Sequence, residues 1–129
     1  MNKNQYSFIA LIQKQRIEQV FIIIINNALD ALKLNQAYET RELKISLRDE
    51  NEHIVVSFED NGGGIDEEIM PHIFDPFQST KVEGGIGIGL NVAKRIMHDH
   101  GGEILARNYE NGAIFEVYIP KKSKLQDDL

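Results

Sequence analysis

An uninterrupted helical segment constrains the fold of this chain more than any other feature of its sequence. Residues 13–34 contain no glycine or proline, and their apolar residues recur with the period of an α-helix. The apolar side of the helical wheel carries Ile17, Val20, Phe21, Ile24, Ile25, Ala28, Ala31 and Leu32. The polar side carries Gln19, Asn26, Asp30 and Lys33, with Ile23 among them and Asn27 at its edge. Because the apolar side must pack against another element, the segment predicts a layered domain.

The composition is typical of one globular domain. The chain has 129 residues, of which 42% are hydrophobic and 26% are charged. We therefore expect a single domain over residues 1–129, with an ordered core over about residues 6–120. The polar residues 121–129 are expected to form a frayed tail.

Several classes of protein are excluded or disfavoured. Without cysteine, the chain has no disulfides and no thiolate metal ligands. A net charge of −6 argues against binding to nucleic acid. The longest apolar run, residues 20–25, is far shorter than the roughly 20 residues that span a bilayer, and the N-terminus does not resemble a signal peptide. We expect a monomeric cytoplasmic domain without membrane contact, or the cytoplasmic part of a larger protein.

Short apolar or alternating segments predict strands around this helix. The expected strands are residues 6–12, 42–48, 53–60, 103–108 and 113–120. Residues 88–100 predict a second long helix that ends at two glycines, and residues 66–70 predict a short helix capped by Asp66. This order predicts an α+β fold in which helices cover one face of a mixed, mostly antiparallel sheet.

The two adjacent asparagines of the first helix allow two interpretations. The polar side on which they lie either faces water or contributes to a site for a metal ion and a nucleotide. Ile23 is unusual for a solvent-facing surface, and Asn27 is expected to be partly buried, where a carboxamide needs a partner. A carboxamide oxygen is able to ligate Mg²⁺, an ion that also binds phosphate oxygens.

Asp60 ends the apolar row formed by Ile54, Val56 and Phe58 on one face of the predicted strand 53–60. A carboxylate that points toward a core needs hydrogen-bond donors. Gly62, Gly63 and Gly64 follow, and the absence of side chains there would let a flat ligand lie against the backbone. Asp60 would then accept a hydrogen bond from an exocyclic amine such as that of adenine. The alternative is a glycine-rich turn whose amides bind Asp60.

A second glycine cluster precedes the second helix. Gly84, Gly85, Gly87 and Gly89 lie where free amides and the positive end of the helix dipole would meet an anion. The pattern matches neither a Walker P-loop nor a Rossmann fingerprint. Lys81, just before it, would either reach a phosphate or remain a solvated loop lysine.

Taken in order, these motifs resemble those of the ATP-binding catalytic domain of sensor histidine kinases, within the superfamily that includes gyrase. The matching segments are QVFIIIINNALDA, DNGGGI, FDPF with STK, and GGIGIGL, which correspond to the N, G1, F and G2 boxes. The resemblance covers about residues 7–120. It implies the two-layer α/β sandwich of the Bergerat ATP-binding fold, with Mg²⁺ and ATP held between the long helix and a short lid.

The resemblance also implies roles for individual residues. Asn27 matches the asparagine that binds Mg²⁺, and Asp60 matches the carboxylate that recognises adenine. The other residues expected to contact the nucleotide are Asn26, Asp30, Gly62, Gly64, Ile65, Phe77, Thr80, Lys81, Gly85, Gly87, Gly89 and Leu90. Asn27 and Lys81 are the residues expected to act in phosphoryl transfer. Phe74 and Phe77 match residues that anchor the lid.

Three features depart from the family pattern. Ile23 occupies a position that is usually polar, which puts metal affinity and transfer rate in doubt, although Asn26 lies about one helical turn away. Ile86 replaces a frequent threonine. The histidine-bearing dimerisation domain that the family phosphorylates has no counterpart in this sequence.

The resemblance implies a protein-histidine kinase catalytic domain of a two-component system. It would transfer the γ-phosphoryl group of ATP to a histidine on the dimerisation domain of the same protein, from which a response regulator would receive it. Two alternatives remain. The chain would be an ATP-binding module with weak or no kinase activity, or a serine kinase of the anti-sigma-factor type, against which FDPF argues.

Overall fold

The structure is a computed structural model that describes residues 3–34, 40–76 and 89–121, with side chains of the first helix described over residues 14–33. Two α-helices, four strands and one turn of 3₁₀ helix lie in these ranges. In chain order they are α1 (Lys3–Leu34), β1 (Leu43–Glu50), β2 (His53–Asp60), η1 (Met70–His72), α2 (Leu90–Asp99), β3 (Glu103–Tyr109) and β4 (Gly112–Pro120).

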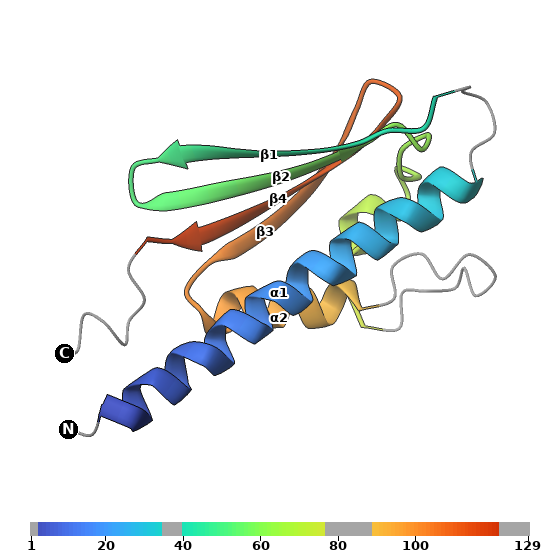
Figure 1. The fold of residues 1–129 in the computed structure, drawn as a ribbon. Coiled ribbons are helices and arrows are strands. Elements are labelled where there is room, and N and C mark those ends of the chain that lie inside the picture. Colours follow the sequence, from blue (N-terminus) through green and yellow to red (C-terminus); the bar gives the residue numbers. More distant parts are fainter. Residues whose placement is uncertain (1–2, 35–39, 77–88, 122–129) are drawn as a thin grey trace.

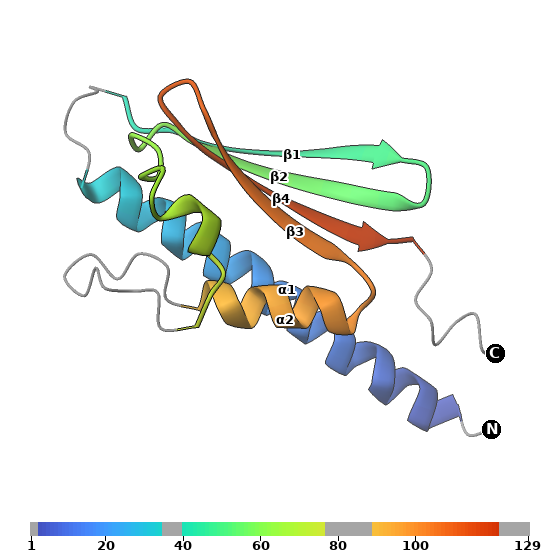
Figure 2. The same cartoon turned by 180° about the vertical axis from the view of Figure 1, so that it is seen from behind.

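The four strands form one sheet with the order β1-β2-β4-β3, and all its strand pairs are antiparallel. Helices α1 and α2 lie side by side beneath one face of this sheet, as Figures 1 and 2 show from opposite sides. The arrangement is the predicted α+β sandwich. The strands form two hairpins, because β1 pairs with β2 and β3 pairs with β4.

Two predicted elements are wrong. Residues 6–12 are not a strand, because α1 already begins at Lys3. A short apolar run does not by itself distinguish a strand from a helix, and no glycine or proline separates it from the helix that follows. Likewise, Asp66 does not cap a helix over residues 66–70. Its side chain accepts a hydrogen bond from the Glu68 amide at 2.8 Å within a turn, and η1 follows at Met70–His72.

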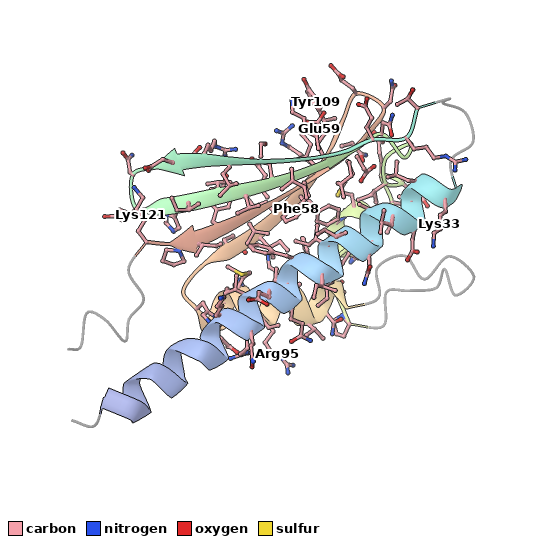
Figure 3. All side chains as sticks on the ribbon, viewed as in Figure 1. Lys33, Phe58, Glu59, Arg95, Tyr109 and Lys121 are labelled. Atoms are coloured by element: carbon pink, nitrogen blue, oxygen red, sulfur yellow. The ribbon has the colours of Figure 1, made fainter. Side chains whose placement is uncertain are left out.

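The core lies between the sheet and the two helices. Side chains of β2 and β4 that face the helices are buried, and Phe58 points from β2 toward α1 in Figure 3. The core residues from the helices include Val20 and Ile24 of α1 and Leu90, Ala93, Ile96 and Met97 of α2. The predicted apolar side of α1 is therefore confirmed as a packing surface.

The edge strand β1 is covered less well than its sequence predicts. Ile45 pairs with Phe58 and Leu47 pairs with Val56, so their side chains share the helix-facing side of the sheet. Even so, Ile45 is 48% exposed and Leu47 is 70% exposed. On the opposite face, Arg48 of the same strand binds Glu116 of β4 with an Nη1–Oε2 distance of 2.9 Å. That contact spans β2 and stabilises the register of three strands.

Two adjacent glycines allow the tight connection between α2 and β3. Gly101 has a left-handed backbone with a φ of +74°, and a Cβ atom there would lie 4.0 Å from its nearest neighbour, Pro120 Cγ. At Gly102 a Cβ atom would lie 2.2 Å from the carbonyl oxygen of Tyr118 in β4. The first glycine is therefore required by backbone conformation and the second by space.

We expect Gly102→Ala to lower the free energy of unfolding by about 3 kcal/mol, because β4 cannot yield to the new methyl group without losing strand pairing. Gly101→Ala is the matched control and should cost about 1 kcal/mol, since only backbone strain opposes it. Urea denaturation of both variants measures the difference. Equal losses would contradict this account of the turn.

Candidate functional site

Helix α1 carries a buried asparagine at the centre of its packed length. Asn27 is only 6% exposed, whereas its neighbour Asn26 is exposed and Asp30 is half-buried. The two asparagines are thus not equivalent, as the helical wheel predicted for the edge position of Asn27. A carboxamide at such a depth is held in one orientation by its surroundings, which suits a ligand-binding role.

Two glycines from distant segments pack against α1 on either side of Asn27. A Cβ atom at Gly62 would lie 3.0 Å from the carbonyl carbon and the Cβ of Ala31, one turn after Asn27. A Cβ atom at Gly89 would lie 3.3 Å from Cγ2 of Ile23, one turn before it. Ile23 and Ala31 are eight residues apart, which corresponds to about 12 Å along the helix. The helix therefore brings Gly62 and Gly89 close to Asn27, and the asparagine lies midway between their contact residues along α1.

Asp60 is buried at the end of β2, as the alternation of that strand predicted. Its Oδ1 accepts a hydrogen bond from the Gly62 amide at 2.8 Å, and the Ala113 amide also donates to the carboxylate. Burial raises the pKa of Asp60 above its ordinary value, and these two amides partly oppose the effect. The predicted alternative, in which loop amides bind Asp60, thus describes part of its environment. A carboxylate offers about four lone-pair positions, so two amides leave room for a further donor.

The loop after Asp60 is held by the hairpin between β3 and β4. Asn108 accepts a hydrogen bond from the Ile65 amide at 2.7 Å and donates one to the Ile65 carbonyl at 2.8 Å. The Gly63 amide donates to the Asn111 carbonyl at 2.8 Å. The sequence does not predict these contacts, because no local pattern links residues that are 43 positions apart.

The N-terminus of α2 is the second part of the site. Gly89 is its N-cap with a φ of +87°, and within the described residues no side chain caps this end of the helix. The next residue, Leu90, is fully buried and fixes the helix against the core. The first backbone amides of α2 therefore start beside Ile23, on the same stretch of α1 as Asn27, and the positive end of the helix dipole lies there.

Phe74 anchors the chain where it leaves the described part of the loop. Its ring lies edge-on to the ring of Phe115 with 6.2 Å between the centroids. The ammonium group of Lys94 lies 4.8 Å from the centre of the Phe74 ring, and it also forms an ion pair with Glu103 at 2.9 Å. Phe74 is thus fixed by both layers of the fold. Its role as an anchor of the lid stays a prediction, because residues 77–88 lie outside the described residues.

Several predicted site residues lie outside the described residues. They are Phe77, Thr80, Lys81, Gly85 and Gly87. Of the described site residues, Gly62 and Gly89 lie against α1 one turn on either side of Asn27. Asp60 is joined to Gly62 by a hydrogen bond, and Leu90 follows Gly89. Gly64 and Ile65 instead contact Asn108 of the β3–β4 hairpin.

The donor set around Asn27 fits a metal ion that is bound mainly by its ligand. Over residues 14–33, 40–76 and 89–121 there is no cluster of three or more histidine, aspartate or glutamate side chains that would hold a metal alone. A single carboxamide oxygen suits Mg²⁺, which usually keeps several waters and takes phosphate oxygens as further ligands. The described part of the chain also has no helix that is both long and apolar enough to cross a membrane.

Comparison with known families agrees with this geometry. Residues 12–123 match the family described as histidine kinase-, DNA gyrase B-, and HSP90-like ATPase. The chain belongs to this family. Among curated relatives, the chain is 37% identical over 112 residues to the two-component sensor PprA of Pseudomonas aeruginosa. This match covers 84% of the chain and 12% of PprA. It is 35% identical over 111 residues to sporulation kinase C of Bacillus subtilis, covering 85% of this chain and 24% of the kinase. The chain thus spans at most about a quarter of these relatives.

Solved structures show the same fold. The catalytic domain of the histidine kinase ThkA superposes with a TM-score of 0.72 at 39% identity, covering 83% of this chain and 67% of that domain. A structure of ThkA in complex with the response regulator TrrA superposes with a TM-score of 0.65 at 35% identity, covering 84% of this chain and 29% of the matched chain. The predicted family and the α/β sandwich are therefore confirmed.

The raised pKa of Asp60 predicts how stability depends on pH. The folded state keeps the Asp60 proton at pH values where the unfolded chain has already lost it, so wild type loses stability as the pH rises from 3.8 through the raised pKa. Asp60→Asn removes this dependence. The stability of wild type relative to Asp60→Asn should therefore increase on acidification, by about 1.4 kcal/mol for each pH unit between the two pKa values.

Urea denaturation of both proteins between neutral pH and mild acid measures this difference. Glu68→Gln, which removes an exposed carboxylate, is the control for general charge effects. A difference between wild type and Asp60→Asn that stays constant with pH would show that the Asp60 carboxyl is not perturbed by burial.

Proposed function

We propose that this chain is the Mg²⁺–ATP-binding catalytic domain of a sensor histidine kinase. The single observation that carries the proposal is the spacing along α1, where Gly62 and Gly89 pack one turn on either side of the buried Asn27. An adenine pocket, a metal ligand and a phosphate-binding helix end then follow one another along about 12 Å of one helix. Family membership supports an ATPase-type site at this place.

Adenine would bind at the sheet end of the site. The Asp60 carboxylate would accept a hydrogen bond from the exocyclic amine, while the Gly62 and Ala113 amides hold the carboxylate in place. At Gly62 the backbone lies directly against Ala31, so any side chain would separate the loop from the helix. Because Asp60 is buried, its hydrogen bond to the ligand would be shielded from water.

The phosphates would bind at the other end, near the N-terminus of α2. Backbone amides after Gly89 and the helix dipole would neutralise part of their charge. Asn27 would hold Mg²⁺ together with the phosphates, and Lys81 would act with it during phosphoryl transfer. A bound Mg²⁺ would supply charge neutralisation at the transferred group. The chain's own contribution would be to orient the triphosphate through α1 and α2.

The acceptor of the phosphoryl group would be a histidine on a dimerisation domain of the same full-length protein. A response-regulator receiver domain would then accept the group from that histidine. These partners are supported by the structure of ThkA in complex with the response regulator TrrA and by the kinases among the relatives. We further propose that this domain is cytoplasmic, contacts neither membrane nor nucleic acid, and is monomeric by itself.

One observation supports the alternative of an ATP-binding module with weak or no kinase activity. Ile23 packs against Gly89 and the core, at a helix position that would otherwise offer a polar group near the phosphates. The chain would then bind ATP without efficient transfer. A serine kinase of the anti-sigma-factor type is the other alternative, and its product would carry acid-stable phosphate.

Asp60→Ala tests the proposed function most directly. It should abolish ADP binding in calorimetry, because it removes the carboxylate that would recognise adenine. The control is Glu59→Ala, which changes the preceding residue of β2; Glu59 points away from the helices in Figure 3. Unchanged ADP affinity in Asp60→Ala would refute the adenine pocket.

Labelled ATP and an isolated histidine hairpin from the same kinase distinguish the three functions. Acid-labile phosphate on the hairpin supports the histidine kinase. ATP binding without transfer supports the binding module, and acid-stable phosphate on a serine supports the third alternative.

Substitution of Ile23 tests whether the departure from the family pattern weakens the site. We expect Ile23→Asn to strengthen Mg²⁺-dependent nucleotide binding or turnover, because it adds a carboxamide one turn before Asn27. It should also lower the free energy of unfolding by about 1–3 kcal/mol, since a polar group replaces a packed one. Ile23→Ala is the control that loses packing without adding an oxygen. Equal nucleotide binding in both variants would mean that Ile23 acts only in packing.

A further inference from the structure

The β3–β4 hairpin lies against the loop that follows Asp60. Figure 1 shows the turn of this hairpin at the same end of the molecule as the loop and the C-terminal end of α1. The approach is close, because a Cβ atom at Gly112 would lie 1.6 Å from the carbonyl oxygen of Asp60. Figure 2 shows the same proximity from behind. The hairpin is therefore part of the wall that holds residues 60–65.

Asn108 makes the most specific contact between the two segments. Its Oδ1 accepts from the Ile65 amide at 2.7 Å, while its Nδ2 donates to the Ile65 carbonyl at 2.8 Å. The side chain of Asn108 thus binds both the backbone N–H and the backbone C=O of Ile65. A Cβ atom at Gly64 would lie 3.0 Å from Oδ1 of Asn108, so the glycine is needed for the side chain to reach Ile65.

The loop needs such external support because it has little of its own. Gly63 and Gly64 have φ angles of +97° and +83°, and residues without side chains lose much conformational entropy when they are held in one shape. Within the loop, the contacts to Asn108 and Asn111 fix Ile65 and Gly63 from outside. The same loop starts at Asp60 and contains Gly62, which contacts α1.

We propose that Asn108 is a positioning residue for nucleotide binding, which acts by holding the loop 61–65 in the shape that the adenine pocket requires. This inference rests on the proposed function. The contacts of Asn108 are to Ile65 and Gly64, so it would act on Asp60 indirectly, through the loop. Pre-forming the loop reduces the entropy lost when a ligand binds, so loss of this support should weaken affinity more than it weakens the fold.

Two substitutions at Asn108 separate its acceptor from its donor. Asn108→Ala removes both hydrogen bonds to Ile65. Asn108→Asp keeps an oxygen for the Ile65 amide but places a second oxygen opposite the Ile65 carbonyl, where it cannot donate. Arg107→Ala is the control on the same strand, because neighbouring residues of a strand point to opposite faces.

We expect Asn108→Ala to weaken ADP binding in calorimetry by about tenfold, which corresponds to one or two lost hydrogen bonds. Asn108→Asp should weaken it by a smaller factor, and Arg107→Ala should leave it unchanged. Hydrogen exchange of the unliganded proteins provides a second readout. In Asn108→Ala the Ile65 amide should exchange faster, whereas the Gly63 amide, bound by a backbone carbonyl, should change less.

The outcomes are distinguishable. Faster exchange at Ile65 with unchanged ADP affinity would overturn the inference, since the contact would then be only a local structural one. An affinity loss that merely follows a lowered unfolding temperature, and that Arg107→Ala shares, would overturn it as well. If wild type binds no adenine nucleotide, the proposed function fails and this inference fails with it, while the exchange data still report whether the contact forms.

Discussion

The close approach of two glycine-bearing segments to α1 is the constraint on which the rest of the site depends. Gly62 leaves no space for a side chain between its own backbone and Ala31, and Gly89 leaves little between its backbone and Ile23. Asn27 lies between these two contacts on a helix that cannot shift without separating one of them. The C-terminal end of α2 is also tied to the middle of α1, where Asp99 binds Arg16 at 2.8 Å. These contacts set α1 and α2 antiparallel and fix the N-terminus of α2 near Asn27.

Features with a local physical cause were predictable from the sequence. The alternation of residues 53–60 placed Asp60 on the buried face of β2, because side chains of a strand alternate strictly between faces. The helical period placed Asn27 at the edge of the packed surface. The segment 6–12 was not predictable in this way, since an apolar run of that length suits a strand or a helix equally. The choice between strand and helix depends on whether the segment joins a neighbouring helix. Here it does, because α1 runs without a break from Lys3 to Leu34.

Features that depend on the meeting of distant segments could not be predicted. Nothing near Asn108 in the sequence indicates that its side chain binds both backbone groups of Ile65. The exposure of Leu47 could not be predicted either. The alternation of its strand predicts a buried face, but β1 lies at the edge of the sheet, where that face stays exposed. The cation of Lys94 over the Phe74 ring likewise joins α2 to a loop through tertiary packing alone.

The environment of Asp60 shows how the proposed recognition of adenine would conflict with a stable core. A carboxylate buried to this degree costs folding free energy, which is why its pKa is raised even though two amides bind it. A neutral side chain of similar size would avoid this cost. A buried charge that the fold only partly compensates gains most from a ligand that adds a donor, because the ligand then supplies the missing hydrogen bond in a site sheltered from water. The incomplete compensation of Asp60 within the protein therefore favours the proposed adenine pocket over a purely structural role for this carboxylate.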